Sequence, residues 1–497
     1  MLKSSLLEII RSFSKQDLLK FEDFVRSPYF NKKENVSRLF MEIKNYAPSF
    51  TDGNLEKEKT WAKLFPGTEY NYGIMKNLIH DLTKLSDSFI AIEYSNADKL
   101  KSNIDLLAAL LQRQISKVFS AKYDMTEKIY IDPALKNESY KMEQYYDFLF
   151  KLKLLKAIYN RLHNPGSSSF EYITESGNYF LYSAVINFYK YYNNYLAFND
   201  RHIQVKDSTA ETFLNGLNKN FIPDLIKKVK TNSEREYKIL KCFYEMNIAL
   251  NPDADISCYN NFKKSLQDCS DIIPRGDLKD LLVCLNNSLT KIREGKSNTG
   301  INSNREILEI SNMEIENNLF LQPNGVMDQN SYINYILTAF TLREYESIEI
   351  FVKKFGSKIP EDRRENVNNY SQAHISFGKK EFDKSLEYLS KINHDFFNMK
   401  HLVRDIQMMN YYELNDYVSF DFALDSYKHF IAKNKSVTPH NRSLSEDFCN
   451  NIKKLFRLRE SFDKFELEKV RKEIINNKLI NKYWILDKLS EIENNNS

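Results

Sequence analysis

The sequence predicts an all-α protein built from stacked antiparallel helical hairpins, and three observations lead to this fold class. The chain has only 12 glycines and 11 prolines among 497 residues, well under the roughly 12% that these residues contribute to an average globular protein. Apolar residues recur at helical spacing along most of the chain, and aromatic turns in its C-terminal half recur at a nearly constant interval. Few chain breakers favour long helices over a β-sandwich or a doubly wound α/β fold, which need many glycine turns.

The composition indicates a folded protein with a mixed surface. Apolar residues make up 42% of the chain and aromatic residues 13%, which is ample for a large core. The 71 basic and 67 acidic residues leave a net charge of +4. So close a balance is typical of a solvated surface and argues against a nucleic-acid-binding polycation.

We expect a soluble, cytoplasmic protein with reduced thiols. Its five cysteines are an odd number without paired spacing, which is typical of free thiols in a reducing compartment. Glu8 interrupts the apolar run from Leu6 to Ile10, so no secretory signal is expected. No segment approaches the roughly 18 consecutive apolar residues of a membrane span.

Local signals bound the first predicted helix. Ser14 and Asp17 have the form of a capping box, and apolar residues follow at helical spacing. Pro28 disfavours helical geometry at the residue before it, so this helix is expected to end at Ser27.

The stretch SPYFN at residues 27–31 predicts a corner between two helices. Asn31 is a favourable N-cap, and Glu34 lies three residues later, where its carboxylate can accept the free backbone amide of the cap. Tyr29 and Phe30 are expected to plug the space beneath the corner. A binding site is the alternative interpretation of these two aromatics, and the structural one is favoured.

Two further segments have clear helical patterns. Between Ile74 and Ile92 the apolar residues step by three and four, which predicts one long amphipathic helix. The segment Tyr179–Phe198 carries two apolar stripes, and a helix that is apolar on two faces is usually sandwiched between neighbouring helices. A functional interpretation is that the aromatics of this segment line a groove for bases or peptides. Packing in the core of a layered all-α array is the favoured interpretation.

Turn-forming residues divide the chain into four predicted regions. Asn164–Ser169 combines a turn-forming pair with a polar run, and Gly295–Asn304 is a second such segment. The last residues, Asn494–Ser497, are expected to be frayed. The regions are an N-terminal helical region (1–165), a helical hairpin region (170–295), hairpin repeats (304–445) and C-terminal helices (446–497).

An internal repeat is the most informative pattern. Tyr345, Phe382 and Tyr417 each belong to a short polar turn, and they lie 37 and 35 residues apart. That interval accommodates two antiparallel helices of three to four turns each, with their loops. Such units bury their apolar faces by stacking on one another.

Residues 331–432 resemble the tetratricopeptide repeat, whose period is about 34 residues. In the best unit Ala373 and Ser385 take the two small positions where paired helices touch, Phe382 takes the turn aromatic and Leu389 the large apolar position. The preceding unit departs from the pattern, because isoleucines occupy its small positions. The resemblance implies a tetratricopeptide-like superhelix in which the inner helix of each hairpin lines a concave groove.

The same resemblance assigns nine residues to the concave groove. Almost none of them is the Lys, Asn or Arg with which the best-known members of that family clamp a peptide carboxylate, so that ligand is not expected. An apolar and aromatic groove suits an amphipathic helix or a hydrophobic peptide. The alternative is that another helical layer of the same protein fills the groove. The nine residues are Ile333, Leu337, Phe340, Tyr370, His374, Phe377, Asp405, Met409 and Tyr412.

A second resemblance concerns the two ends of the chain. The corner SPYFN and the segment Lys482–Leu489, with the sequence KYWILDKL, resemble features of a family of uncharacterised bacterial proteins. This resemblance implies an architecture and no particular chemistry.

The sequence lacks familiar motifs for catalysis. It contains no HExxH, GxSxG or GxGxxG pattern, so we expect neither an enzyme nor a cofactor. His394, His401 and Asp405 would share one face of a helix. Their spacing is loose for a metal site, and no metal is expected.

The sequence therefore predicts a non-enzymatic scaffold or adaptor that binds a protein or peptide along a concave surface. The alternative is a nucleic-acid-associated regulator. Residues 453–482 contain ten basic and five acidic residues and form a basic stripe that would contact phosphates, and the N-terminal helices would allow a helix-turn-helix. The acidic residues interleave with the basic ones, as on an ordinary solvated helix face.

Overall fold

The protein is helical wherever the structure describes it. The computed structural model describes residues 4–130, 140–163, 167–199, 209, 212–213, 216–251, 253–295, 302–322, 324–393, 400–433, 439–476 and 481–496. Within these ranges the only pairing of extended backbone is an isolated bridge between Leu321 and Met327, so the predicted all-α class is confirmed. No helix in the described ranges has both the length and the apolar character needed to cross a membrane. Of the two expected dividing segments, Asn164–Ser169 and Gly295–Asn304, residues 164–166 and 296–301 fall outside these ranges.

The helices gather into two compact units. One comprises Met1–Ala134 and Glu143–Ala184, and the other comprises Leu135–Met142 and Val185–Ser497. Helix α9 (Ser167–Asn199) contributes residues to both.

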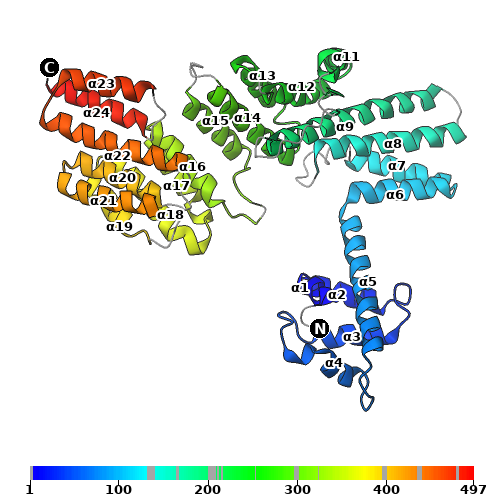
Figure 1. Ribbon diagram of the computed structural model, residues 1–497. Coiled ribbons are helices and arrows are strands. Elements are labelled where there is room, and N and C mark those ends of the chain that lie inside the picture. The colour runs from blue at the N-terminus through cyan, green and yellow to red at the C-terminus, as the bar shows by residue number, and fades with distance from the viewer. Residues whose placement is uncertain are drawn as a thin grey trace. The chain divides into compact units, whose positions relative to one another are not determined.

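In the first unit, helices α1 to α4 pack together with the long helix α5 (Figure 1). The core between them is aromatic, because the ring of Phe21 lies 4.8 Å from that of Phe40 and 5.2 Å from that of Phe89. Helix α5 (Tyr72–Ala97) confirms the long helix expected at residues 74–92. The other helices up to α8 are α1 (Ser5–Arg11), α2 (Lys15–Arg26), α3 (Glu34–Lys44), α4 (Lys57–Leu64), α6 (Lys99–Gln112), α7 (Ser116–Tyr130) and α8 (Met142–His163).

The start and the end of α2 are as predicted. The hydroxyl of Ser14 accepts a hydrogen bond from the amide of Asp17, and the carboxylate of Asp17 accepts one from the amide of Ser14. The helix ends at Arg26 with Ser27 as its C-cap, because Pro28 restricts the backbone of the residue before it.

The corner after α2 departs from the prediction in two ways. Asn31 does not cap α3, whose N-cap is Lys33. The Asn31 side-chain amide instead donates to the carbonyl of Val25 at 2.9 Å, a local bond that competes with capping. Tyr29 is not a plug, because 85% of its surface is exposed. Phe30 is not buried either, because 41% of its surface is exposed, but its ring stacks on that of Phe24 of α2 at 4.0 Å.

Helix α9 confirms that the aromatic segment at residues 179–198 is helical. One of its two stripes is buried, at Tyr182, Ile186 and Tyr189. The other stripe is covered in part, since Val185 is buried and Leu181 is half-buried. Core packing explains these side chains, and those of residues 195–198 lie outside the described part of the chain.

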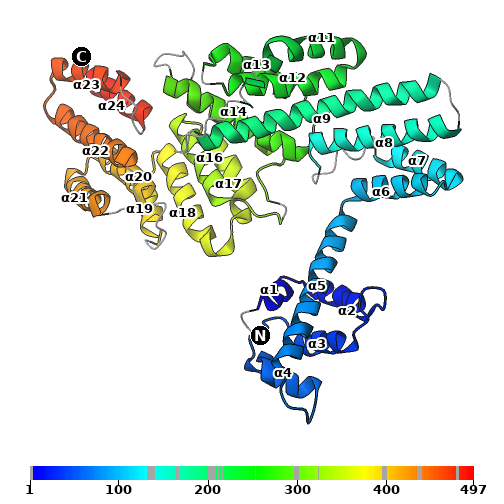
Figure 2. The ribbon, with the colours of Figure 1, turned by 45° about the vertical axis from the view of Figure 1, so that its right-hand side comes forward.

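In the second unit, each helix from α11 to α24 packs against the next one along the chain. Alternate helices also touch from α16 onwards, so that α16, α18, α20, α22 and α24 form one row (Figure 2). We call this the inner row. The helices before it are α11 (Ile222–Asn232), α12 (Glu234–Ala249), α13 (Ile256–Gln267), α14 (Arg275–Gly295) and α15 (Ser303–Glu316).

The helices from α16 to α24 share one hydrophobic core. Its buried residues run from Leu308 on α15 to Ile492 on α24. The helices are α16 (Gln329–Thr341), α17 (Tyr345–Phe355), α18 (Glu361–Gly378), α19 (Phe382–Ser390), α20 (Lys400–Glu413), α21 (Tyr417–Lys433), α22 (Pro439–Glu460), α23 (Lys464–Asn476) and α24 (Lys482–Asn495).

Three turns in this region have the same backbone geometry. A residue with left-handed backbone follows α16, α18 and α20, namely Arg343 (φ 63°), Lys380 (φ 62°) and Asn415 (φ 56°). In each turn the amides of that residue and of the next one bond back to carbonyls at the end of the helix, which is the Schellman motif. These residues are 37 and 35 positions apart, so the interval found among the aromatics is the interval between hairpin turns.

Small residues lie where neighbouring helices touch. The hydroxyl of Ser385 donates to the carbonyl of Ala373 at 2.8 Å, and both residues are buried. At Gly378 the approach is closer still, because an added Cβ would lie 2.5 Å from the ring of Tyr345. The turn aromatic of one hairpin therefore rests against the glycine of the next and sets the spacing between them.

We predict that Gly378→Ala destabilises the inner row by about 1–3 kcal/mol, because the added methyl group overlaps the Tyr345 ring and forces the hairpins apart. Hydrogen exchange of α18 amides in increasing urea would measure the loss. Gly177→Ala on α9 is the matched control, since no atom lies within 4 Å of the added Cβ and alanine favours the helix. Equal stability changes in the two variants would contradict this account of the contact.

Candidate functional site

The nine residues assigned to a concave groove lie on α16, α18 and α20, and the structure brings them together. The ring of Phe340 lies 4.7 Å from that of His374 and 5.4 Å from that of Phe377. Eight of the nine are nevertheless buried, with at most 5% of their surface exposed, and only Leu337 is half-buried. The eight buried residues are Ile333, Phe340, Tyr370, His374, Phe377, Asp405, Met409 and Tyr412.

The C-terminal helices cover part of this surface. The ring of Tyr412 lies 5.0 Å from that of Phe456 on α22 and 5.4 Å from that of Trp484 on α24. The guanidinium of Arg459 lies 3.9 Å from the centre of the same tyrosine ring. Helices of the same protein thus occupy the space over Tyr412. That the nine residues bind a partner stays a prediction, and a partner would reach them only where they border an open pocket.

Such a pocket, of about 630 Å³, opens beside the turns that end α16, α18 and α20. We call it the turn pocket. Three of the nine predicted residues, Phe340, Phe377 and Met409, form part of its wall. The rest of the wall comes from residues close to the left-handed turns and from α24. They are Thr341, Arg343, Tyr345, Gly378, Lys380, Phe382, Glu413, Asn481, Tyr483, Trp484, Asp487, Lys488, Glu491, Asn494 and Asn495.

The repeated turn places equivalent residues around the pocket. Thr341, Gly378 and Glu413 each precede the left-handed residue of their turn by two positions, and all three line the pocket. The first two carry no charge, whereas the third is a carboxylate. This difference makes the third turn the anchor for α24.

Glu413 joins α20 to α24. Its carboxylate accepts a hydrogen bond from the indole Nε1 of Trp484 at 2.8 Å and pairs with the ammonium of Lys488 at 2.8 Å. The side chains of Glu413 and Lys488 are only 12% and 11% exposed, so water screens the pair weakly and the charge-assisted bonds are strong. Removing Lys488 would leave the shielded Glu413 carboxylate with the indole of Trp484 but without its cation, which is costly.

Most charges around the pocket are neutralised within the chain. Arg343 pairs with Asp487, and Lys488 also pairs with Glu491 at 2.8 Å. Lys380 differs, because it is exposed and no acidic side chain in the described part of the chain forms an ion pair with it. The turn pocket thus combines aromatic walls with one unpaired cation at its edge.

Sequence reasoning missed the role of α24. In the sequence, Lys482–Leu489 stands out only through its resemblance to a feature of a family of uncharacterised bacterial proteins. Trp484 is one of two tryptophans in the chain, which is the one signal that pointed to it. Its hydrogen-bond partner Glu413 is 71 residues away, and no local pattern connects the two.

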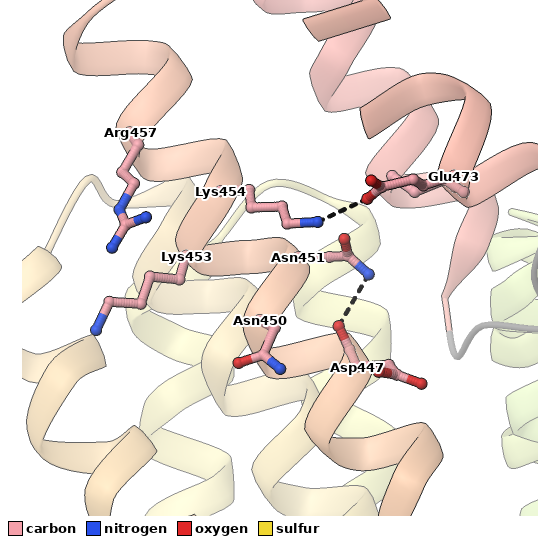
Figure 3. A pocket seen from close by; sticks show the side chains of 8 residues that line it. Asp447, Asn450, Asn451, Lys453, Lys454, Arg457 and Glu473 are labelled. Carbon is pink, nitrogen blue, oxygen red and sulfur yellow. Dashed lines mark hydrogen bonds and ion pairs between the residues drawn. The ribbon is translucent and has the colours of Figure 1, made fainter. Parts of the chain in front are cut away.

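The basic stripe at residues 453–482 lies mainly on α22 and α23. Figure 3 shows Lys454 reaching Glu473 at 2.7 Å, whereas Lys453 and Arg457 point away from that pair. Acidic and basic side chains together line a pocket of about 380 Å³ here. This mixture weakens the attraction for phosphates and favours an ordinary solvated face.

Several lysines of the N-terminal helices are also paired with acidic residues. Such pairing lowers the positive potential that a nucleic-acid contact needs, so it lends no support to the helix-turn-helix alternative. The pairs are Lys20 with Glu93 at 2.5 Å, Lys33 with Asp81 at 2.7 Å and Lys63 with Glu42 at 2.6 Å.

The candidate metal ligands are not assembled in the described residues. His394 lies outside them, and His401 and Asp405 lie one turn apart on α20. In the described ranges no three His, Cys, Asp or Glu side chains are arranged to hold a metal ion. All five cysteines are free thiols, and three of them are buried.

Comparison with known proteins identifies no relative. No protein-family model, no curated protein and no solved structure matches the chain. The resemblances to the tetratricopeptide repeat and to a bacterial family therefore stay predictions from the sequence.

Asp405 is buried behind the site with one carboxylate oxygen unsatisfied. Its Oδ1 accepts a hydrogen bond from the hydroxyl of Tyr427 at 3.0 Å, whereas Oδ2 has no partner among the described residues. Burial raises the pKa of Asp405 to about 7, and Tyr370 and Cys449 face it from α18 and α22. His374 behaves in the opposite way, because burial lowers its pKa to about 4.

We predict that Asp405→Asn gains stability relative to the wild-type protein as the pH rises. The folded protein keeps the Asp405 proton up to about pH 7, whereas the unfolded chain releases it near 3.8. The stability linked to this proton is present below about pH 4 and lost by about pH 8, a change of about 4 kcal/mol. The difference between the two proteins isolates this effect, because His374 titrates in both. Urea unfolding across this pH range would measure it, and a difference independent of pH would refute the assignment.

Proposed function

We propose that the protein acts as a scaffold or adaptor, a non-enzymatic role in which the turn pocket binds a peptide segment of a partner protein. Its C-terminal half would be a tetratricopeptide-like superhelix, with the inner row on its concave side. Two observations support this architecture: alternate helices touch along the row, and three turns share one geometry at intervals of 37 and 35 residues.

The main support for peptide binding is the composition of the turn pocket. Its volume of about 630 Å³ lies within the range of roughly 300–1,000 Å³ typical of ligand sites. Partly exposed rings such as those of Phe382 and Tyr483 suit an aromatic or large aliphatic side chain. The unpaired ammonium of Lys380 at the edge suits a carboxylate. The partner segment is therefore expected to carry an apolar anchor next to an Asp or Glu.

The state of the pocket's own acids favours binding over chemistry. Glu413 is engaged by Trp484 and Lys488, and Asp487 is engaged by Arg343. Both carboxylates are thus engaged by groups of the protein itself. These groups are suited to holding the walls of a pocket in place.

We predict that peptides selected on the full-length protein from a phage-displayed library of random dodecapeptides carry an aromatic or aliphatic anchor beside an acidic residue. Lys380→Glu should weaken their binding about tenfold or more, because it reverses the only unpaired charge at the pocket among the described residues. Lys464→Glu is the matched control, since Lys464 is an exposed lysine of α23 outside the pocket. Fluorescence polarisation of the labelled peptides would give the affinities.

A second variant tests the aromatic wall without touching charge. Tyr483 is 40% exposed, so Tyr483→Ala should lower affinity while leaving the helical circular dichroism unchanged. Selected peptides that bind the Lys380→Glu, Tyr483→Ala and wild-type proteins equally would rule out this pocket as the partner site. A library that yields no binder would do the same.

A further inference from the structure

A serine and a histidine form a hydrogen-bonded pair in the first compact unit. The hydroxyl of Ser116 lies 2.6 Å from Nε2 of His163. Ser116 is the first residue of α7, and His163 is the last residue of α8. This distance and this choice of atoms are those of a serine nucleophile and its general base.

The contact of the second ring nitrogen, Nδ1, determines which nitrogen of His163 carries the proton. Nδ1 of His163 lies 2.9 Å from the backbone carbonyl of Tyr159, and a carbonyl only accepts hydrogen bonds, so Nδ1 carries the proton. In the neutral ring Nε2 is then the acceptor, and the Ser116 hydroxyl donates to it. The histidine is thus in the tautomer that can take a proton from the serine.

Ring stacking holds the imidazole in this orientation. The ring of His163 stacks on that of Tyr159 at 4.4 Å and 21°, and Tyr159 stacks on Phe119 at 4.7 Å and 14°. Phe119 is on α7 and is fully buried. One stack therefore connects the base on α8 to the helix that carries the nucleophile.

Free backbone amides lie next to the serine oxygen. No carbonyl in the described part of the chain accepts a hydrogen bond from the amides of Ser116, Lys117 and Val118, which form the first turn of α7. Such amides carry partial positive charge at a helix N-terminus. The amide of the residue after a nucleophile is a common donor to the oxyanion of acyl transfer.

A pocket of about 290 Å³ adjoins the pair. Its lining includes Ser116 and His163, and the rest is mainly apolar, from Leu111, Ile115, Phe119, Tyr159 and Leu162. Ile115 and Leu162 are 39% and 63% exposed, so the pocket is open to water. Its size and lining suit a short apolar acyl chain.

From this geometry we infer that Ser116 and His163 form a catalytic pair that hydrolyses esters of short apolar acids. Ser116 Oγ bonds to the carbonyl carbon of the ester while its proton passes to His163 Nε2. The bond between that carbon and the alkoxy oxygen then breaks, and the proton on Nε2 leaves with the alcohol. Water attacks the acyl-serine, gives its proton to Nε2 and releases the acid, and the proton returns to Ser116. The activity belongs to the first unit and does not depend on the scaffold role.

Covalent labelling and ester hydrolysis by the full-length protein test this inference. A fluorophosphonate probe should label Ser116, as located by peptide mass spectrometry. With p-nitrophenyl butyrate as substrate, Ser116→Ala and His163→Gln should each lower the hydrolysis rate by about 100-fold, the usual contribution of a general base. His163 is exposed, Ser116 is half-buried, and both lie at helix ends, so the variants should keep the wild-type circular dichroism.

The control is His80→Gln, which removes an exposed imidazole of α5 and should leave the rate unchanged. Free imidazole hydrolyses activated esters without a serine, so retention of the rate in Ser116→Ala would overturn the inference. Absence of probe on Ser116 would overturn it as well. In either case the hydrogen bond would serve only to join α7 to α8.

Discussion

The C-terminal half depends on one backbone conformation, the left-handed residue that ends three successive inner helices. At Arg343, Lys380 and Asn415 the chain reverses through the same hydrogen-bonded turn, although glycine would adopt this conformation at lower cost. Because the reversal is identical each time, equivalent positions of successive hairpins face the same space. The turn pocket exists because of this repetition, and the side chains of Arg343 and Lys380 border it.

Helix α24 supplies one wall of the turn pocket. It is tied to the third turn through Glu413 and to the first turn through the ion pair of Arg343 with Asp487. These two turns are therefore linked by a single helix. For one residue expected on an open groove the cause of burial is clear, because side chains from α22 and α24 occupy the space over Tyr412.

Features set by neighbours in the sequence were the ones that could be predicted. The helical class, the capping of α2 and the interval between hairpins all follow from local spacing and from few chain breakers. The role of Asn31 at the corner was mispredicted because a short polar side chain can form several local hydrogen bonds of similar strength. The turn pocket could not be predicted from the sequence for another reason. Glu413 and Trp484 meet across 71 residues, and only the folded stack determines that they face each other.

The two tryptophans of the chain fall in different compact units. Trp61 is buried in the first unit, where its indole donates to the carbonyl of Thr68 at 3.3 Å, whereas Trp484 stands in the wall of the turn pocket beside a carboxylate. Indole emission responds to polarity and to nearby charge. The intrinsic fluorescence of the protein is therefore the sum of two spectroscopically distinct sources. In a chain in which phenylalanine replaces Trp61, the remaining tryptophan emission would come from the turn pocket alone and would report on it without any attached dye.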